Sequence, residues 1–140
     1  MTTRWFEDYA ESSGWEFWPL LVDEADVIDF GQRFDPQPFH VDPAAAAAGP
    51  YGVLIANGRH SCALMMRLLA EQYLSPASSL GSPGIDELRR ILPVRPGDEL
   101  TLKTTVREAR RARTSPTAAW CGRTSSSSTR ATPSSSASSP

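Results

Sequence analysis

Residues 57–74, NGRHSCALMMRLLAEQYL, place the tightest constraint on the fold of this chain. Their apolar side chains lie around most of the circumference of a helix rather than along one narrow stripe. They are Ala63, Leu64, Met65, Met66, Leu68 and Leu69. A helix with this pattern is predicted to be buried instead of lying on a surface. The rest of the chain must therefore supply elements that cover it.

Three other segments are predicted to be strands. Residues 14–22 are apolar and aromatic, and Pro19 among them confines this segment to an edge strand or an extended arm. Residues 85–94 follow a turn, and residues 99–109 alternate as an antiparallel strand does. The alternation places Leu100, Leu102, Thr104 and Val106 on one face. A buried helix followed by antiparallel strands indicates an α+β domain in which a sheet wraps around residues 57–74.

Two shorter helices are predicted before the long one. Asp23 is an N-cap candidate for a helix over residues 24–33, and the prolines that follow end this helix. A second helix is predicted from its N-cap Asp42, with proline at its first position, to Gly49.

Charge and hydropathy argue against several classes of protein. The net charge of −2 and the pI near 5.6 disfavour a nucleic-acid binder, and the basic run at 107–113 is interpreted as a solvated face or a strand edge. No window approaches the roughly 18 apolar residues of a membrane span, and the N-terminus lacks the pattern of a signal peptide. Cys62 and Cys121 form neither a metal-ligand pattern nor a disulfide framework, so the expected compartment is the reducing cytoplasm.

The composition changes abruptly after residue 113. Residues 114–140 contain no Leu, Ile, Val, Met or Phe and no acidic residue. Such a segment cannot bury enough apolar surface to offset the entropy lost on ordering. We therefore predict one domain over residues 1–113, followed by a low-complexity tail that is disordered as written.

An acid and an imidazole lie close together in FDPQPFHVDP, residues 34–43. If Asp35 and His40 face one water or one substrate proton, they supply a general acid and a general base together. The prolines on either side of Gln37 reduce the backbone freedom that this geometry costs. The alternative is that Asp35 only ends a helix and His40 only packs against aromatic neighbours.

Gly58 lies at the start of the long helix, where the first backbone amides have no partner within the helix. A glycine there lets a substrate oxygen approach closely, and the positive end of the helix dipole favours developing negative charge. The alternative is that Asn57 is only an N-cap and that Gly58 only provides backbone clearance. His60 and Cys62, just inside the helix, are interpreted as packing residues.

Three stretches together resemble the MaoC-like dehydratases, the (R)-specific enoyl-CoA hydratase family. They are FEDYAESSGWEF, RFDPQPFHVDPAAAAAGPYGVLIANGRHSCALMMRLL and LGSPGIDELRRILPVRPGDEL. The resemblance runs from about residue 5 to about residue 112 and is densest over 34–69. The spacing of Asp35, His40 and Gly58 is specific in combination.

The resemblance implies a hot-dog fold, in which an antiparallel sheet wraps a long central helix at about residues 57–74. It also implies reversible hydration of a trans-2-enoyl-CoA to an (R)-3-hydroxyacyl-CoA by a homodimer, with no metal and no redox cofactor. The substrate is a thioester of CoA or of an acyl-carrier protein. By the same resemblance, Asp35 and His40 match the catalytic pair that holds and activates water, and either of them can be the base. Gly58 matches the glycine whose backbone N–H polarises the thioester carbonyl.

One position departs from the family. Some members carry a hydroxyl residue in the central helix that hydrogen-bonds the catalytic carboxylate, and Met66 occupies that place here. The orientation of Asp35 is therefore expected to come from elsewhere. Four arginines could meet the phosphates of a substrate, and no spacing singles out one of them; they are Arg59, Arg67, Arg89 and Arg90.

The family normally continues with two more strands where residues 114–140 lie. The Ser, Thr, Ala, Arg and Pro content of this tail is typical of a GC-rich gene translated out of frame, and the codons permit an alternating aliphatic strand in another frame. We predict a frameshifted tail and a truncated domain that is unstable or inactive as written. Nucleotide sequence around codons 110–117 tests this prediction.

Two rival functions remain open. A hot-dog acyl-CoA thioesterase needs a carboxylate that activates water at C1 of the thioester, and the spacing of Asp35 and His40 favours the hydratase over it. A non-catalytic acyl-thioester-binding partner subunit, or an inactive remnant, is kept open by the composition of residues 114–140.

Overall fold

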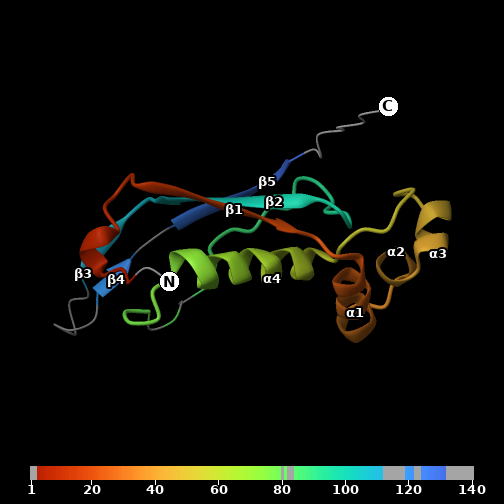
Figure 1. The fold of residues 1–140 in the computed structure, drawn as a ribbon, viewed down its shortest axis with the longest axis horizontal. Helices are drawn as coiled ribbons and strands as arrows, with labels where there is room; N and C mark the ends of the chain where they lie inside the picture. The colour runs from red at the N-terminus through yellow and green to blue at the C-terminus, as the bar shows by residue number, and fades with distance from the viewer. Residues whose placement is uncertain (1–2, 80, 82–83, 112–118, 122–123, 132–140) are drawn as a thin grey trace, which may run out of the picture. The chain divides into compact units, whose positions relative to one another are not determined.

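The computed structural model describes residues 3–79, 81, 84–111, 119–121 and 124–131 (Figure 1). These residues belong to two units. One contains the described residues of Met1–Trp18, Met65–Arg89 and Thr101–Thr129, and the other contains those of Pro19–Leu64, Arg90–Leu100 and Arg130–Pro140. Asp35, His40 and Gly58 all belong to the second unit.

A three-stranded sheet confirms two of the predicted strands. Strand β2 (Glu99–Val106) lies between β1 (Gly14–Leu21) and β5 (Thr124–Ala131). The side chains of β2 alternate between buried and less buried positions, and the buried ones are Leu100, Leu102, Thr104 and Val106. This is the face that the sequence pattern predicts, because side chains of a strand alternate between its two faces.

Strand β1 is an edge of this sheet, as Pro19 predicts, since a proline has no N–H to give to a neighbouring strand. Its pairing with β2 is antiparallel. Val106 N donates to Ser13 O just before β1 begins, and Val22 N donates to Asp98 O just after β1 ends. The fold is the α+β hot-dog fold that the resemblance implies.

Four aromatic residues pack together in the first unit. Tyr73 closes a π-helical turn, η2 (Leu69–Tyr73), and its ring meets the edges of three others. The ring centroids of Tyr9, Trp15 and Phe17 lie 5.3, 5.4 and 5.9 Å from that of Tyr73. Such tilted contacts are the favoured geometry for aromatic pairs. They join β1 to the end of the long helical segment within this unit.

Three helices precede the long one in the second unit: α1 (Glu24–Phe34), α2 (Pro38–Val41) and α3 (Pro43–Ala48). Helix α2 packs against both α1 and α3. The predicted caps are confirmed, because the Asp23 carboxylate accepts from Asp26 N and that of Asp42 accepts from Ala44 N and Ala45 N. The core of this unit is formed by Val22, Val27, Ala46, Leu54, Ala56, Leu64 and Leu100.

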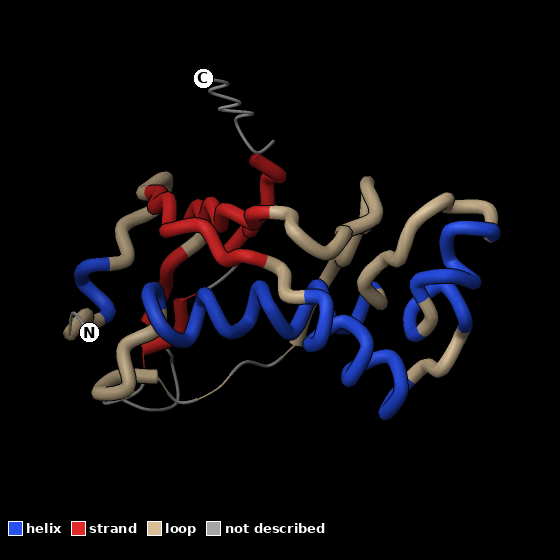
Figure 2. The backbone as a smooth tube through the Cα atoms, turned by 45° about the vertical axis from the view of Figure 1, so that its right-hand side comes forward, coloured by secondary structure: helices blue, strands red, loops and turns tan. Residues whose placement is uncertain are grey.

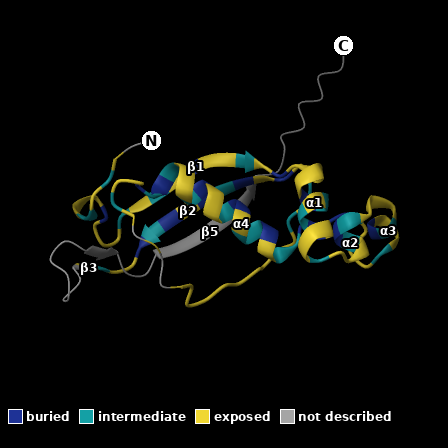
Figure 3. Ribbon diagram, turned by 90° about the horizontal axis from the view of Figure 1, so that it is seen from below, coloured by how far each residue is buried: buried dark blue, intermediate teal, exposed yellow. Residues whose placement is uncertain are grey.

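Helix α4 (Gly58–Leu68) corrects one prediction. It is not buried around most of its circumference, and Figure 3 shows exposed residues along it. The buried residues form one stripe, His60, Leu64 and Leu68, while the Met66 side chain is 49% exposed. The physical reason is that a helix buries only the face that other residues cover, and the described residues cover Met66 only in part.

The segment of residues 85–94 also differs from the prediction. It is not a strand, and Figure 2 draws it as loop. Its larger apolar side chains are exposed; they are Ile85, Leu88, Ile91 and Leu92. Its residues do not alternate regularly between apolar and polar, and Arg89 pairs with Glu87 two positions away. Only near its end does Val94 O accept a hydrogen bond from Ala56 N, so a full ladder with a neighbouring strand is missing among the described residues.

Part of the tail differs from the predicted disorder. Strand β4 (Ala119–Cys121) pairs antiparallel with β3 (Ala109–Arg111), and β5 adjoins β2. Backbone hydrogen bonds form without aliphatic side chains, so a Ser-rich composition does not forbid a strand. The rest of residues 114–140 lies outside the described residues, and the frameshift stays a prediction. No helix in the described part of the chain is long and apolar enough to span a bilayer.

Candidate active site

Helix α1 ends where the first candidate residue stands. Asp35 is its C-cap, and the Asp35 backbone N–H donates to Gly31 O at 2.8 Å. Pro36 cannot continue the helix, and the chain enters a new helical turn at Pro38. His40 therefore lies on the single turn of α2. Pro38 is well tolerated at the first position of this turn, because the N–H that proline lacks would have no partner within the helix.

Gly31 lets α2 pack directly on α1. A Cβ atom at this position would lie 2.9 Å from Val41 Cγ1 and 3.0 Å from His40 O. Both distances are too short for ordinary packing, so the requirement for glycine is one of space. Gly31 thereby sets the separation between the helix that ends at Asp35 and the turn that carries His40.

The His40 ring is buried and is held by a backbone carbonyl. Its Nδ1 lies 2.7 Å from Ile55 O. Because a carbonyl oxygen can only accept, Nδ1 carries the hydrogen, and Nε2 of the neutral ring is left as an acceptor. Nε2 faces Asp35 Oδ2 at 3.6 Å, with the two side chains 7% and 31% exposed. This distance is too long for a direct hydrogen bond. An ionised Asp35 and a neutral His40 thus present two acceptors to one small donor such as water.

The Asp35 carboxylate is oriented by two side-chain amides. Gln37 Nε2 donates to Oδ1 at 2.8 Å, and Asn57 Nδ2 donates to Oδ2 at 2.5 Å. The orientation of Asp35 is expected from the sequence to come from elsewhere, because Met66 replaces the hydroxyl residue of some family members. These two amide donors supply that orientation.

The start of α4 completes the site. Asn57 Oδ1 accepts from Arg59 N at 2.7 Å, which makes Asn57 the N-cap that the sequence suggested. A Cβ atom at Gly58 would overlap the side chain of Arg90, whose Cζ would be 2.7 Å away, so Arg90 would have to move aside. The glycine therefore permits a close approach to the backbone at the first turn of the helix.

One pocket of about 410 Å³ brings the three predicted residues together. Its lining consists of Phe30, Phe34, Asp35, His40, Asn57, Gly58, Arg59 and Arg90. Phe30 and Phe34 form an apolar wall, with ring centroids 4.7 Å apart. The pocket thus combines an acid–imidazole pair, a helix start and an apolar surface.

The four candidate arginines separate into two groups. Arg59 and Arg90 line the pocket, whereas Arg67 and Arg89 form ion pairs with carboxylates of their own segments. Sequence reasoning did not identify how Asn57 and Gln37 hold the carboxylate, since amides before a glycine or between prolines carry no spacing signal. Among the described residues, no three His, Cys, Asp or Glu side chains could jointly hold a metal ion.

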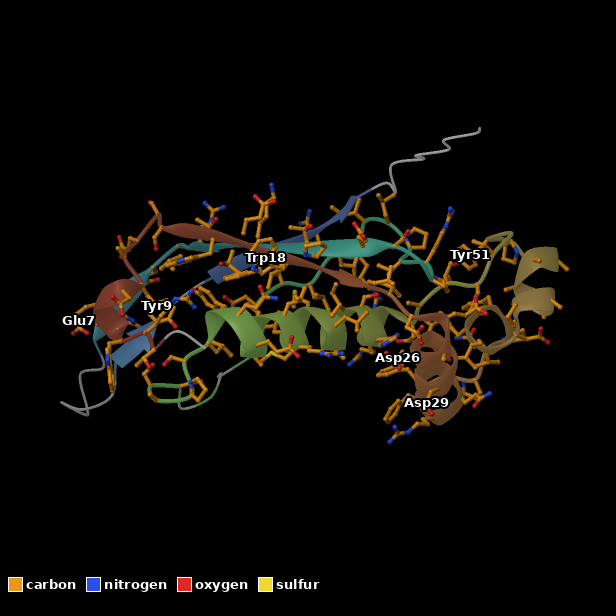
Figure 4. All side chains as sticks on the ribbon, viewed as in Figure 1. Glu7, Tyr9, Trp18, Asp26, Asp29 and Tyr51 are labelled. Carbon is orange, nitrogen blue, oxygen red and sulfur yellow. The ribbon has the colours of Figure 1, made fainter. Side chains whose placement is uncertain are left out.

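His60 packs as the sequence predicts. It is 5% exposed, and its ring stacks on that of Phe30 with centroids 4.8 Å apart. Burial lowers the pKa of His60 below its ordinary value of 6.5, and the carboxylate of Asp26, labelled in Figure 4, opposes this in part. Cys62 is half-buried.

Replacing His60 with Phe is expected to weaken the loss of stability on acidification. Since the pKa of His60 is lower in the folded chain, the unfolded chain takes up the proton first, and stability falls as the pH drops through about 6.5. Phenylalanine keeps the ring and removes the titration. Urea unfolding at several pH values around 6.5 measures the effect. Parallel losses for the variant and the parent chain would contradict the prediction.

Comparison with known proteins finds one matching family. The sequence pattern described as the MaoC-like domain matches residues 14–122. The 3-hydroxyacyl-thioester dehydratase Z of Mycobacterium tuberculosis H37Rv is 33% identical over 91 residues, which are 64% of this chain and 60% of that protein. The chain spans 57–60% of the length of the curated relatives that it matches.

Two solved structures are similar over most of the chain. A MaoC-like dehydratase from Rhodospirillum rubrum is 33% identical, with a TM-score of 0.69, over 89% of this chain and 84% of that one. The unliganded R-hydratase PhaJ1 from Pseudomonas aeruginosa is 28% identical, with a TM-score of 0.60, over 74% of this chain and 64% of that one.

Proposed function

This chain belongs to the MaoC-like dehydratase family, and we propose that it is a hydratase/dehydratase of acyl thioesters. It interconverts a trans-2-enoyl thioester and an (R)-3-hydroxyacyl thioester by adding or removing water. The observation that carries the proposal is the convergence of Asp35 Oδ2 and His40 Nε2, 3.6 Å apart, in a pocket that also contains Gly58. The names of the dehydratase and R-hydratase relatives support the reaction class.

The pair can hold the attacking water through two hydrogen bonds. Water donates one hydrogen to Asp35 Oδ2 and the other to His40 Nε2, because both are acceptors when Asp35 is ionised and His40 is neutral. As the water oxygen bonds to C3, one member of the pair takes its proton.

The negative charge released by this step moves to the thioester oxygen. The Gly58 N–H at the start of α4 is the proposed donor to that oxygen, aided by the positive end of the helix. A proton returned by the pair to C2 then completes the addition. The net change is one hydroxyl on C3 and one hydrogen on C2, so the enzyme is regenerated without a cofactor in this scheme.

A spectrophotometric assay on crotonyl-CoA tests the function. We expect loss of the enone absorbance without release of free CoA thiol, and chiral chromatography should show the (R)-3-hydroxy product. Release of free CoA thiol that is not preceded by hydration of the double bond would favour a thioesterase and overturn the proposal. Binding of crotonyl-CoA with neither change would favour a non-catalytic partner subunit or a remnant.

We further propose a homodimer in the cytoplasm that takes its substrate from CoA or from an acyl-carrier protein. These points are supported by the family membership alone. Light scattering after gel filtration measures the oligomeric state, and parallel assays with crotonyl-CoA and a crotonyl-carrier protein distinguish the carriers.

Replacing Gly58 with Ala is expected to lower kcat/KM for crotonyl-CoA by about 100-fold, the scale of an ångström-sized misplacement. The added methyl group keeps the thioester oxygen away from the helix amide and also collides with Arg90. The double variant Gly58→Ala/Arg90→Ala separates these effects, with Arg90→Ala alone as its reference. We expect the double variant to stay slow. Full recovery would mean that Gly58 serves only to clear Arg90.

A further inference from the structure

Asn57 uses both ends of its side-chain amide. Its Oδ1 accepts from Arg59 N at 2.7 Å, and its Nδ2 donates to Asp35 Oδ2 at 2.5 Å. The orientation of the amide follows from its neighbours. A backbone N–H can only donate and an ionised carboxylate can only accept, so exchanging the amide oxygen and nitrogen would break both bonds.

These two bonds tie the acid to the start of α4. Asn57 O also accepts from Ser61 N at 3.1 Å, as expected for the residue that opens a helix. The residue that caps α4 is thus the immediate neighbour of Gly58 and the direct partner of Asp35. One half-buried side chain spans the distance between the two parts of the site that must meet the same substrate.

We propose that Asn57 is a positioning residue that holds Asp35 in register with the Gly58 amide. This inference rests on the proposed hydratase function and deepens it. It assigns to Asn57 the orienting role that a hydroxyl residue has in some family members, at the place that Met66 occupies in this chain. Asn57 contacts the carboxylate and the helix, and it acts on the reaction through them.

The chemistry of the position explains why asparagine is suited to it. Serine caps a helix as well as asparagine does, but its single short hydroxyl cannot both accept from Arg59 N and reach Asp35. Aspartate would also cap, but it would set a second carboxylate against Asp35. Alanine would lose both bonds. These three replacements therefore separate the cap from the positioning contact.

Asn57→Ser is the decisive variant. We expect kcat for crotonyl-CoA to fall about 10- to 100-fold, because misplacement of a catalytic group by about an ångström has effects of this size. KM and the midpoint of thermal unfolding should stay close to those of the parent chain. Asn57→Ala should lose kcat and also unfold at a lower temperature, since it removes the cap.

The effect must depend on Asp35. In an Asp35→Ala background, Asn57→Ser is expected to lower kcat no further, as is typical of residues that act as a unit. In Asn57→Asp, the acid limb of the pH profile of kcat/KM should move to higher pH, because the added carboxylate disfavours ionisation of its neighbour. The other charged or titratable groups that line this pocket are His40, Arg59 and Arg90.

An NMR measurement makes the result independent of turnover. The side-chain amide resonances of Asn57 should shift in Asp35→Ala and stay in place in Asp29→Asn, whose acid lies on the exposed part of α1. Unchanged kcat in Asn57→Ser at an unchanged unfolding midpoint would overturn the inference and leave Asn57 as a cap alone. If the parent chain does not hydrate crotonyl-CoA, the proposed function fails. If the Asn57 amide resonances do not shift in Asp35→Ala, the contact between Asn57 and Asp35 is overturned.

Discussion

Replacing Asp35 with Asn is expected to lower kcat/KM for hydration of crotonyl-CoA by about 10²- to 10⁴-fold, the usual contribution of a general acid or base. The amide has nearly the same shape as the carboxylate but cannot take a proton from water. In addition, the amide has only one oxygen, so it cannot accept from both Gln37 and Asn57, whose side chains each donate to one oxygen of Asp35. Because Asp35 is half-buried, the midpoint of thermal unfolding should change little.

The matched control is Asp29→Asn, a replacement of the same type on the same helix. Asp29, labelled in Figure 4, is exposed and forms an i,i+4 ion pair with Arg33 at 3.5 Å. Such surface pairs contribute little, so neither activity nor stability should change measurably. If Asp35→Asn hydrates crotonyl-CoA at a rate within a few-fold of that of the parent chain, Asp35 is not a catalytic residue.

His40→Ala gives a second test of the pair with a less simple interpretation. Loss of the imidazole would slow hydration by a factor similar to that of Asp35→Asn. It would also leave the buried Ile55 O without its side-chain partner. The unfolding midpoint of this variant should therefore fall together with its rate. For this reason Asp35→Asn is the cleaner measurement.

The candidate site could be predicted as residues, but its geometry could not. The spacing of Asp35, His40 and Gly58 nominated all three only together with the family resemblance, and the pocket contains all three. Their mutual distances depend on Gly31, which allows α2 to pack on α1, and on Asn57, which joins two segments 22 positions apart. Contacts between distant parts of a chain leave no local pattern, so Gly31 carried no signal and Asn57 was identified only as an N-cap candidate.

The fold shows the same division between local and long-range causes. The strand of residues 99–106 and the caps Asp23 and Asp42 followed from alternation and from hydrogen bonds within three residues. The predicted strand at 85–94 did not form, because a strand also needs a neighbour that its own sequence does not specify. The burial of α4 was overestimated for a related reason, since an apolar side chain such as Met66 is buried only where another element covers it.

Replacing Leu102 with Ala is expected to cost about 2–5 kcal/mol of unfolding free energy. Leu102 lies in the middle of β2 and is fully buried, so the variant loses the transfer energy of the side chain and also leaves a cavity. Since small domains have only about 5–15 kcal/mol in total, this loss is a large share. Urea unfolding followed by tryptophan fluorescence measures it.

The control is Leu21→Ala at the end of β1, where the side chain is 64% exposed and the expected change is within about 0.5 kcal/mol. Equal effects of the two replacements would mean that the inner face of β2 does not pack as a core. The parent chain also tests the prediction that the truncated domain is unstable as written. If residues 114–140 fail to supply the strands that the family normally has there, unfolding should be broad and Leu102→Ala should cost little, because a loosely packed core has less to lose. A sharp transition together with the full penalty at Leu102 would instead show that the chain as written holds a packed sheet.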